Sequence, residues 1–413
     1  MENNLKVINV NGALIALYFI EGLKAVSIST RIKAGSWYEG GKNWGKAHLL
    51  EHMLFQGTER FIDKQAMDIF KEENGIWNNA WTSGAQMQMS LRMPSESLKA
   101  GLNLMNEMLF KASLPEKKIE NEKKIIAQEY EDLWSRPGVR FNRKIDEQFF
   151  GKNHAYARNG IGELEYVTKI TRQELVDYYK KMIVSMNMSI GIAGNFDVKK
   201  AEEELKNMLF FKGNDATTDF EKVKPSTKRL IHFEPGMKSV NINIGWLTKG
   251  IKETSFEDRL KINIISYLLG GSARSLLFRK VREEMGIAYD IWTDYEFYPS
   301  ITRFSVQTSV NPEKIEELLL EVNLLIKKFI NEPIDKEIFR RVKKYLIMSK
   351  KMSYESSMGT AEILSSSLFW EGRVISPEEY IKLLKKITED EVRTMVQGIF
   401  LGKKPLISIM MSR

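Results

Sequence analysis

The chain has 413 residues, 62 Lys and Arg against 54 Asp and Glu, and a formal net charge of +8. One hydrophobic core rarely serves a chain of this length, so we expect at least two domains. Cysteine is absent, which excludes disulfides, thiolate metal sites and cysteine nucleophiles and leaves histidine and carboxylate side chains as ligands for any metal.

The charge pattern and the N-terminus exclude two classes of partner. Lys and Arg alternate with Glu along 116–124 and 336–351, a pattern typical of solvated helix faces, so we expect no binding to nucleic acid. The first residues, Met1-Glu2-Asn3-Asn4, do not form the basic and apolar regions of a secretory signal, and no apolar run approaches the length of a membrane span. We therefore expect a cytoplasmic protein without a membrane segment.

Strands are predicted at the start of the chain. Alternating apolar residues indicate strands at 5–7, 14–19 and 26–32, and Asn11-Gly12 is typical of a hairpin turn between the first two. Short glycine-rich breaks separate the third strand from a helix.

That helix, Ala47-His48-Leu49-Leu50-Glu51-His52-Met53-Leu54-Phe55, contains two of the four histidines of the chain. On a helix, His48 and His52 lie one above the other on one face, with Glu51 beside them. Two imidazoles on adjacent turns can bind one Zn²⁺, and a glutamate beside the ion can act as a general base. The alternative is a pair of core or capping histidines on an amphipathic helix.

A second predicted helix contains carboxylates that could join the histidines at a metal site. After a helix at 63–73 and a strand, turn and strand at 76–93, Pro115 opens a helix that runs to about 134. Carboxylates are rarely buried unless they are paired or bind a metal, so two glutamates on its inward stripe suggest a further metal ligand. Solvated glutamates on a partly exposed stripe are the alternative. The stripe is Ile119, Glu122, Ile126, Glu129 and Leu133.

A polar, turn-rich run at 212–228 is predicted to be a linker. It would divide the chain into an N-terminal domain, 1–211, and a C-terminal domain, 229–413. A helix at 172–186 and a strand at 188–193 close the first of these.

The order of elements in the first half recurs in the second, which predicts an internal duplication. Helix 259–269 takes the place of the histidine helix but contains no histidine. Helix 335–352 takes the place of 115–134, with Arg and Lys where the glutamates were. We therefore expect metal ligands in the first half only. The other corresponding segments are 26–32 with 240–246, 170–175 with 387–392, and the closing strands 188–193 and 405–411.

Together these motifs resemble the M16 (pitrilysin-type) zinc metallopeptidases, a family of inverzincins named for the motif H-x-x-E-H, over essentially the whole chain. In that family a glutamate follows the second histidine by 77 positions, where Glu129 stands here, and another lies seven residues earlier, where Glu122 stands. Other matching segments are Ala34-Gly35-Ser36, the continuation to Thr58, Asn79-Ala80-Trp81-Thr82, and Val281 to Tyr289.

The resemblance implies an α+β fold of two homologous domains, each a mostly antiparallel sheet packed against helices. The size of the chain is similar to that of the single-unit, dimeric subfamily. Two chains would enclose a chamber that admits unstructured peptides, as a homodimer or as a heterodimer with a related chain.

The resemblance also assigns site residues. His48, His52 and Glu129 would bind Zn²⁺ and leave its fourth position open, the arrangement of a catalytic site. Glu51 would be the general base. Glu122 would hold a ligand in orientation.

Further residues would bind the substrate. Asn79 and Ala80 would lie on an exposed strand to which a peptide adds as a further strand, although an ordinary strand with a turn at Asn78-Asn79 is the alternative. Arg282 and Tyr289 would donate hydrogen bonds to the substrate backbone or to the oxyanion. The remaining histidines, His154 and His232, are interpreted as structural.

The expected function is a zinc-dependent endopeptidase that cleaves unfolded peptides. A non-catalytic peptide-binding subunit of a heterodimeric M16 peptidase is the leading alternative. A metal-dependent hydrolase of small molecules is a weaker one.

Overall fold

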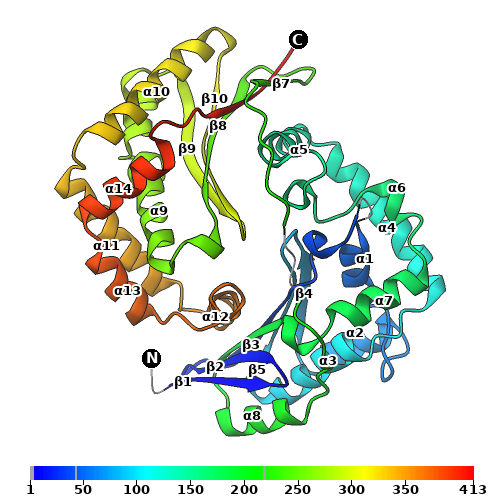
Figure 1. Cartoon of the computed structure of the whole chain (residues 1–413). Coiled ribbons are helices and arrows are strands. Elements are labelled where there is room, and N and C mark those ends of the chain that lie inside the picture. The colour runs from blue at the N-terminus through cyan, green and yellow to red at the C-terminus, as the bar shows by residue number, and fades with distance from the viewer. Residues whose placement is uncertain (1–3, 42–43, 217–219) are drawn as a thin grey trace. The chain divides into compact units, whose positions relative to one another are not determined.

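A computed structural model describes residues 4–41, 44–216 and 220–413, which form two compact units, each built on its own sheet (Figure 1). The units differ from the predicted domains, 1–211 and 229–413, because each half of the chain gives one segment to the other unit. Unit 1 consists of Met1–Ser135, Arg158–Asp219 and Lys351–Glu378, and unit 2 of Arg136–Ala157, Phe220–Lys350 and Glu379–Arg413.

Unit 1 contains most of the elements predicted for the first half. Its strands are β1 (Leu5–Val10), β2 (Ala13–Phe19), β3 (Ala25–Ile32), β4 (Trp77–Thr82), β5 (Met87–Pro94) and β6 (Met188–Gly194). Its helices are α1 (Lys46–Met53), α2 (Lys64–Glu73), α3 (Leu98–Phe110), α4 (Glu116–Trp134), α6 (Leu164–Val167), α7 (Arg172–Met182), α8 (Val198–Asn207) and α12 (Ser357–Glu371).

Unit 2 is built from the second half and one helix of the first. Its strands are β7 (Leu230–Phe233), β8 (Val240–Lys249), β9 (Ala288–Phe297), β10 (Ile301–Val310) and β11 (Leu406–Met411). Its helices are α5 (Pro137–Phe150), α9 (Phe256–Leu269), the π-helix η7 (Phe278–Glu284), α10 (Ile315–Asn331), α11 (Lys336–Met352), α13 (Pro377–Lys386) and α14 (Glu389–Phe400). Helices α11 and α13 each cross the boundary between the units near one end. The described residues between α8 and β7 form no helix or strand.

Five strands of each sheet follow the same order, which agrees with the predicted duplication, and unit 1 has β1 as an additional edge strand. Among the described residues, the sheet of unit 1 has the order β1-β2-β6-β3-β5-β4 and that of unit 2 the order β7-β11-β8-β10-β9. Each has one parallel pair, β2 with β6 and β7 with β11, and its other pairs are antiparallel. Two mostly antiparallel sheets packed against helices confirm the predicted α+β fold.

The predicted hairpin at Asn11-Gly12 is also present. Val10 pairs with Ala13 across the turn, and both turn residues have positive φ, 53° and 105°. A two-residue turn of this kind requires positive φ at both positions, which Asn and Gly tolerate best.

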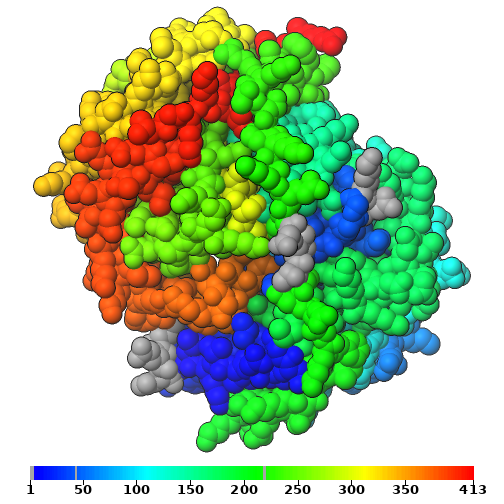
Figure 2. Space-filling model, viewed as in Figure 1, coloured from blue at the N-terminus to red at the C-terminus, as the bar shows by residue number. Residues whose placement is uncertain are grey.

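The exchanged helix α12 packs on β2, β3 and β6 of unit 1, so that the orange segment lies beside the blue strands in Figures 1 and 2. Small side chains allow this close approach. Serine hydroxyls meet in two pairs, Ser27 with Ser357 and Ser29 with Ser365, each at 2.9 Å. At the same surface, a Cβ atom on Gly191 would overlap the carbonyl oxygen of Ala361.

Helix α5 makes the corresponding contact in unit 2. It packs on β7 and β11, and a Cβ atom on Gly245 of β8 would overlap the ring of Phe149. Gln148 of the same helix donates to the carbonyl oxygen of Lys228 at 2.9 Å and accepts a hydrogen bond from Ser408. Each sheet is therefore covered on one face by a helix from the other half of the sequence.

The histidine helix α1 is fixed by its apolar side. Leu49, Leu50 and Met53 are fully buried in the core of unit 1. Because the histidines lie on a different face of this helix, core packing sets their direction. No helix among the described residues is long and apolar enough to cross a membrane.

We expect Gly191→Ala to destabilise the protein by about 1–3 kcal/mol, because the new methyl group must displace the backbone of α12. Thermal unfolding would measure the change. Gly398→Ala is the matched control, because a Cβ atom there enters open space within a helix, where alanine is favoured over glycine. Neither glycine has positive φ. Equal melting temperatures for the two variants would contradict this account of the packing.

Candidate active site

The predicted metal ligands lie together in unit 1. His48 and His52 project from α1 toward Glu129 of α4, and their rings meet edge to face with centroids 4.6 Å apart. One carboxylate oxygen of Glu129 lies 3.8 Å from Nε2 of His48 and 3.6 Å from Nε2 of His52. The three ligand atoms of the set lie within 4.8 Å of one another. The spacing read from the sequence therefore corresponds to one cluster in space.

These residues fit a zinc ion. Nitrogen and oxygen ligands about 2.0–2.2 Å from a tetrahedral zinc lie roughly 3.4 Å apart, close to the distances found between the imidazoles and Glu129. Burial, with a contribution from His52, lowers the pKa of His48 to about 3, so this imidazole is neutral, as a metal ligand must be. The side chain of Glu129 is 45% exposed, which leaves one side of the cluster accessible.

Glu122 fixes the orientation of His52. One of its carboxylate oxygens accepts a hydrogen bond from Nδ1 of His52 at 2.8 Å, and the other accepts one from Gln56 at 2.7 Å. A proton held on Nδ1 leaves the lone pair of Nε2 free to bind a metal. Burial would lower the pKa of His52, but the bond to Glu122 and the charges of Glu129 and Glu51 outweigh this, and its pKa is raised.

His48 has no comparable support. Its Nδ1 atom is buried and has no hydrogen-bond partner within the described part of the chain. Packing, and not a hydrogen bond at Nδ1, therefore orients this imidazole.

Helix α11, which corresponds to α4, differs from the prediction made for it. We expected Arg and Lys in α11 where α4 carries its glutamates, but the buried residues of α11 are Phe339, Val342 and Leu346. Their spacing matches that of Ile119, Glu122 and Ile126 in α4, so an apolar residue takes the place of the buried glutamate. The basic residues of α11 lie on its other faces, because the core accepts apolar side chains there at lower cost.

Glu51 lies beside the cluster and is 8% exposed. The hydroxyl of Thr82, at the end of β4, donates a hydrogen bond to its carboxylate. Burial raises the pKa of Glu51, and the bond from Thr82 partly opposes this. A buried carboxylate with a raised pKa, fixed in orientation, suits a general base.

Sequence reasoning missed Glu39, which holds the start of α1. Its carboxylate accepts hydrogen bonds from the backbone N–H groups of Gly45, Lys46 and Ala47 at 2.9, 2.8 and 3.2 Å. Burial raises the pKa of Glu39 to about 7. The sequence offered one indirect signal for it, the lack of a capping side chain before α1. The helix begins after a glycine, so its first backbone N–H groups need an acceptor from elsewhere in the chain.

Asn79 and Ala80 lie on β4, which is the edge strand of its sheet. In the described structure β4 pairs only with β5, so its other edge can accept a further strand. The turn between β4 and β5 lies after Thr82, and not at Asn78-Asn79, so these residues belong to one continuous strand.

Arg282 and Tyr289 belong to unit 2. Arg282 lies in η7 and Tyr289 at the start of β9, and the guanidinium carbon is 5.1 Å from the centroid of the tyrosine ring. Tyr289 is 84% exposed. The structure thus brings these two predicted residues together, with the tyrosine accessible.

The other two histidines make structural contacts. His154 hydrogen-bonds the carbonyl oxygen of Glu221 at 2.8 Å and accepts from the backbone N–H of Tyr156 at 3.1 Å. His232 lies 3.3 Å from a carboxylate oxygen of Glu234. Both contacts agree with the structural interpretation.

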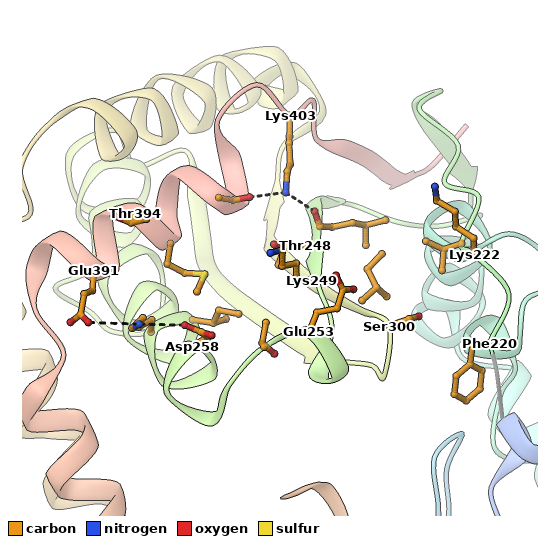
Figure 3. Close-up of a pocket in the computed structure, with 18 of the residues that line it drawn as sticks. Phe220, Lys222, Thr248, Lys249, Glu253, Asp258, Ser300, Glu391, Thr394 and Lys403 are labelled. Carbon is orange, nitrogen blue, oxygen red and sulfur yellow. Dashed lines mark hydrogen bonds and ion pairs between the residues drawn. The ribbon is translucent and has the colours of Figure 1, made fainter. Parts of the chain in front are cut away.

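A cavity of about 920 Å³ in unit 2 does not include any predicted site residue (Figure 3). Two of its lysines are engaged within its own wall. Lys403 donates to the carbonyl oxygens of Gly398 and Leu247 at 2.7 and 3.1 Å, and Lys261 lies 3.3 Å from Asp258. Side-chain chemistry, and not cavity size, therefore identifies the candidate site.

Comparison with known families separates a segment that contains the predicted metal ligands from one that does not. Residues 19–158 match the model of Insulinase (Peptidase family M16), and residues 169–346 match that of the Peptidase M16 inactive domain. All predicted metal ligands lie in the first of these.

Two relatives illustrate the likeness along the chain. A protein of Rickettsia felis named as an uncharacterized zinc protease is 23% identical over 401 residues, which are 97% of this chain and 96% of that protein. The mitochondrial-processing peptidase subunit beta of Caenorhabditis elegans is 26% identical over 396 residues, covering 92% and 84%.

Solved structures share the fold. A protease from Helicobacter pylori superposes with a TM-score of 0.87 at 17% identity, over 98% of this chain and 99% of the other. A putative M16-like peptidase from Alicyclobacillus acidocaldarius gives 0.84 at 17% identity, over 99% and 98%. With both halves matched by M16 models and the fold shared from end to end, the chain belongs to peptidase family M16.

Proposed function

We propose that this protein is a zinc-dependent endopeptidase that cleaves unfolded peptides. The observation that carries the proposal is the convergence of His48, His52 and Glu129 on one point, with the carboxylate of Glu51 beside them. Three protein ligands and an accessible side are typical of catalytic zinc, whereas structural zinc has four protein ligands.

Each residue then has a defined task. When bound, zinc would polarise the peptide carbonyl and make water more acidic. Glu51 would accept a proton from the attacking water and deliver it to the leaving amine. Thr82 would hold Glu51 in place, and Glu122 would keep Nε2 of His52 directed at the metal.

The substrate would bind as a strand on the free edge of β4, beside Asn79 and Ala80. Backbone hydrogen bonds of this kind give affinity with little dependence on sequence. They also require an extended chain, so folded proteins would be poor substrates.

The rival proposal is a non-catalytic peptide-binding subunit, because one half of the chain matches a domain described as inactive. That segment, 169–346, contains no predicted metal ligand, whereas the segment 19–158 contains the full set of His48, Glu51, His52 and Glu129. A chain that only presented peptides would gain nothing from retaining all four, so we favour the peptidase.

We expect Glu51→Gln to retain zinc and to lower kcat by about 10²–10⁴-fold, because the amide preserves shape but cannot accept a proton. Zinc content and cleavage of an unstructured peptide pool would be measured with and without a chelator. Glu73→Gln, at an exposed position of α2, is the control. Full activity in chelated protein, or in Glu51→Gln, would favour the non-catalytic alternative.

For Glu122→Gln we expect zinc affinity to fall by about 10–100-fold, because an amide no longer offers a charged acceptor to Nδ1 of His52. Competition with a chromogenic chelator gives the affinity directly. Glu131→Gln, at an exposed position of the same helix, should bind zinc as the wild type does. Equal affinities in the two variants would mean that Glu122 does not support the ligand.

We propose that Arg282 and Tyr289 bind the substrate backbone. Tyr289→Phe removes one exposed hydroxyl and should lower kcat by at least about tenfold with zinc content unchanged. Tyr345→Phe, at another exposed tyrosine, is the control. Unchanged kinetics in Tyr289→Phe would remove this residue from the site.

We further propose that two chains act together and enclose the substrate. The relative from Caenorhabditis elegans is named as a subunit, so the second chain could be a copy or a related protein. Light scattering on the active protein should give twice the mass of the chain, 47.8 kDa. A monomer with full activity would contradict the two-chain arrangement.

A further inference from the structure

The edge strand β4 exposes two indole rings. Trp77 is 54% exposed and Trp81 is 40% exposed, although tryptophan is usually well buried. Residues at alternate positions of a strand share a face, so Trp77, Asn79 and Trp81 lie on one face of β4. We call these three residues the tryptophan face.

The other face of β4 serves the candidate active site. Thr82 belongs to that face, and its hydroxyl donates to Glu51 of α1. Asn78, on the same face, accepts a hydrogen bond from Lys71 at 3.0 Å. A single strand therefore presents one face to the predicted chemistry and the tryptophans to the opposite side.

On the same side of the sheet, the neighbouring strand β5 has no large apolar residue opposite the tryptophan face. Across the ladder, Trp77 is paired with Arg92, Asn79 with Ser90, and Trp81 with Gln88. The covering helix α12 packs on β2, β3 and β6. The apolar area of the tryptophan face is therefore concentrated at the edge of the sheet, where no strand of the described chain lies beside β4.

We infer that the tryptophan face selects apolar side chains at two positions, four residues apart, in a peptide that is paired with β4. The inference rests on the proposed peptidase function and adds a substrate class to it. A strand paired with β4 places alternate side chains within about 5 Å of those of β4 on the same face. Residues four apart in that strand would then lie beside Trp77 and Trp81, whether the peptide runs parallel or antiparallel.

One of the two selected positions should lie close to the cleaved bond. Trp81 directly precedes Thr82, which contacts the predicted base, whereas Trp77 is about 13 Å further along the strand. A large apolar or aromatic side chain is the ligand that an exposed indole favours, by stacking or edge contact. Substrates would thus carry one apolar residue next to the cleaved bond and another four residues away.

The test compares defined peptides on the zinc-loaded protein. The parent peptide is unstructured and carries phenylalanine at both positions, and two derivatives carry serine at one or the other. We expect wild type to cleave the parent with about tenfold higher kcat/KM than either derivative. Trp81→Ser should lose the preference at the position next to the cleaved bond only, and Trp77→Ser at the distant position only.

Controls separate selection from folding. Ile62→Ser changes another exposed apolar residue of unit 1, outside its strands, and should keep both preferences. Trp81→Phe keeps an aromatic ring and should restore most of the lost preference. Zinc content and melting temperature of each variant show whether it folds.

A second measurement does not depend on cleavage. Fluorescence anisotropy of the labelled peptides on Glu51→Gln should show the same order of affinities, and the same losses when Trp81→Ser or Trp77→Ser is added. Concentration-dependent self-association abolished by these tryptophan substitutions would instead identify a second copy of the chain as the occupant and overturn the inference.

The outcomes distinguish the two levels of the proposal. If wild type cleaves the peptides but selects neither position, or if Trp81→Ser keeps the preference, the tryptophan face does not select substrates and the peptidase proposal stands. If wild type cleaves no peptide with zinc bound, the proposed function itself fails, and this inference fails with it.

Discussion

The candidate site depends on one buried carboxylate. Glu122 is 6% exposed, and a carboxylate in that position is tolerated only when its oxygens accept hydrogen bonds. His52 and Gln56 supply them, so the interior of unit 1 is stable only with α1 and α4 in one relative position. Glu129 follows two turns later on α4, and the same constraint places it opposite the imidazoles. A requirement of the core thus positions an exposed ligand.

The duplicated helix solves the same packing problem without a charge. Val342 of α11 occupies the place of Glu122, between Phe339 and Leu346, and α9 contributes no histidine. An apolar residue needs no partner, so nothing in unit 2 demands an imidazole at the corresponding point. Two units that share the order of five strands therefore differ in chemistry through a few side chains, which is why fold alone did not identify the site.

Much of this arrangement could be predicted from the sequence, because local patterns determine it. Helical spacing placed His48 and His52 on one face, the resemblance to the M16 family selected Glu129 as their partner, and alternation placed the strands. The exchange of α5 and α12 could not be predicted, because periodicity shows which face of a helix is buried but not which sheet covers it. The sign of the exchange in the sequence was a set of small residues, such as Ser27 and Gly191, on a sheet face that would otherwise carry larger side chains.

Strand geometry connects the remaining parts of the site. Because successive side chains of a strand point to opposite faces, Thr82 can reach Glu51 only if Trp81 points away from it. The register of β4 against β5 enforces this choice, since a shift by one residue would exchange the two faces. Substitutions on the face of Trp77 and Trp81 can then alter side-chain contacts without disturbing the base. We infer that a protein of this design can change which peptides it prefers while its predicted hydrolytic chemistry stays constant.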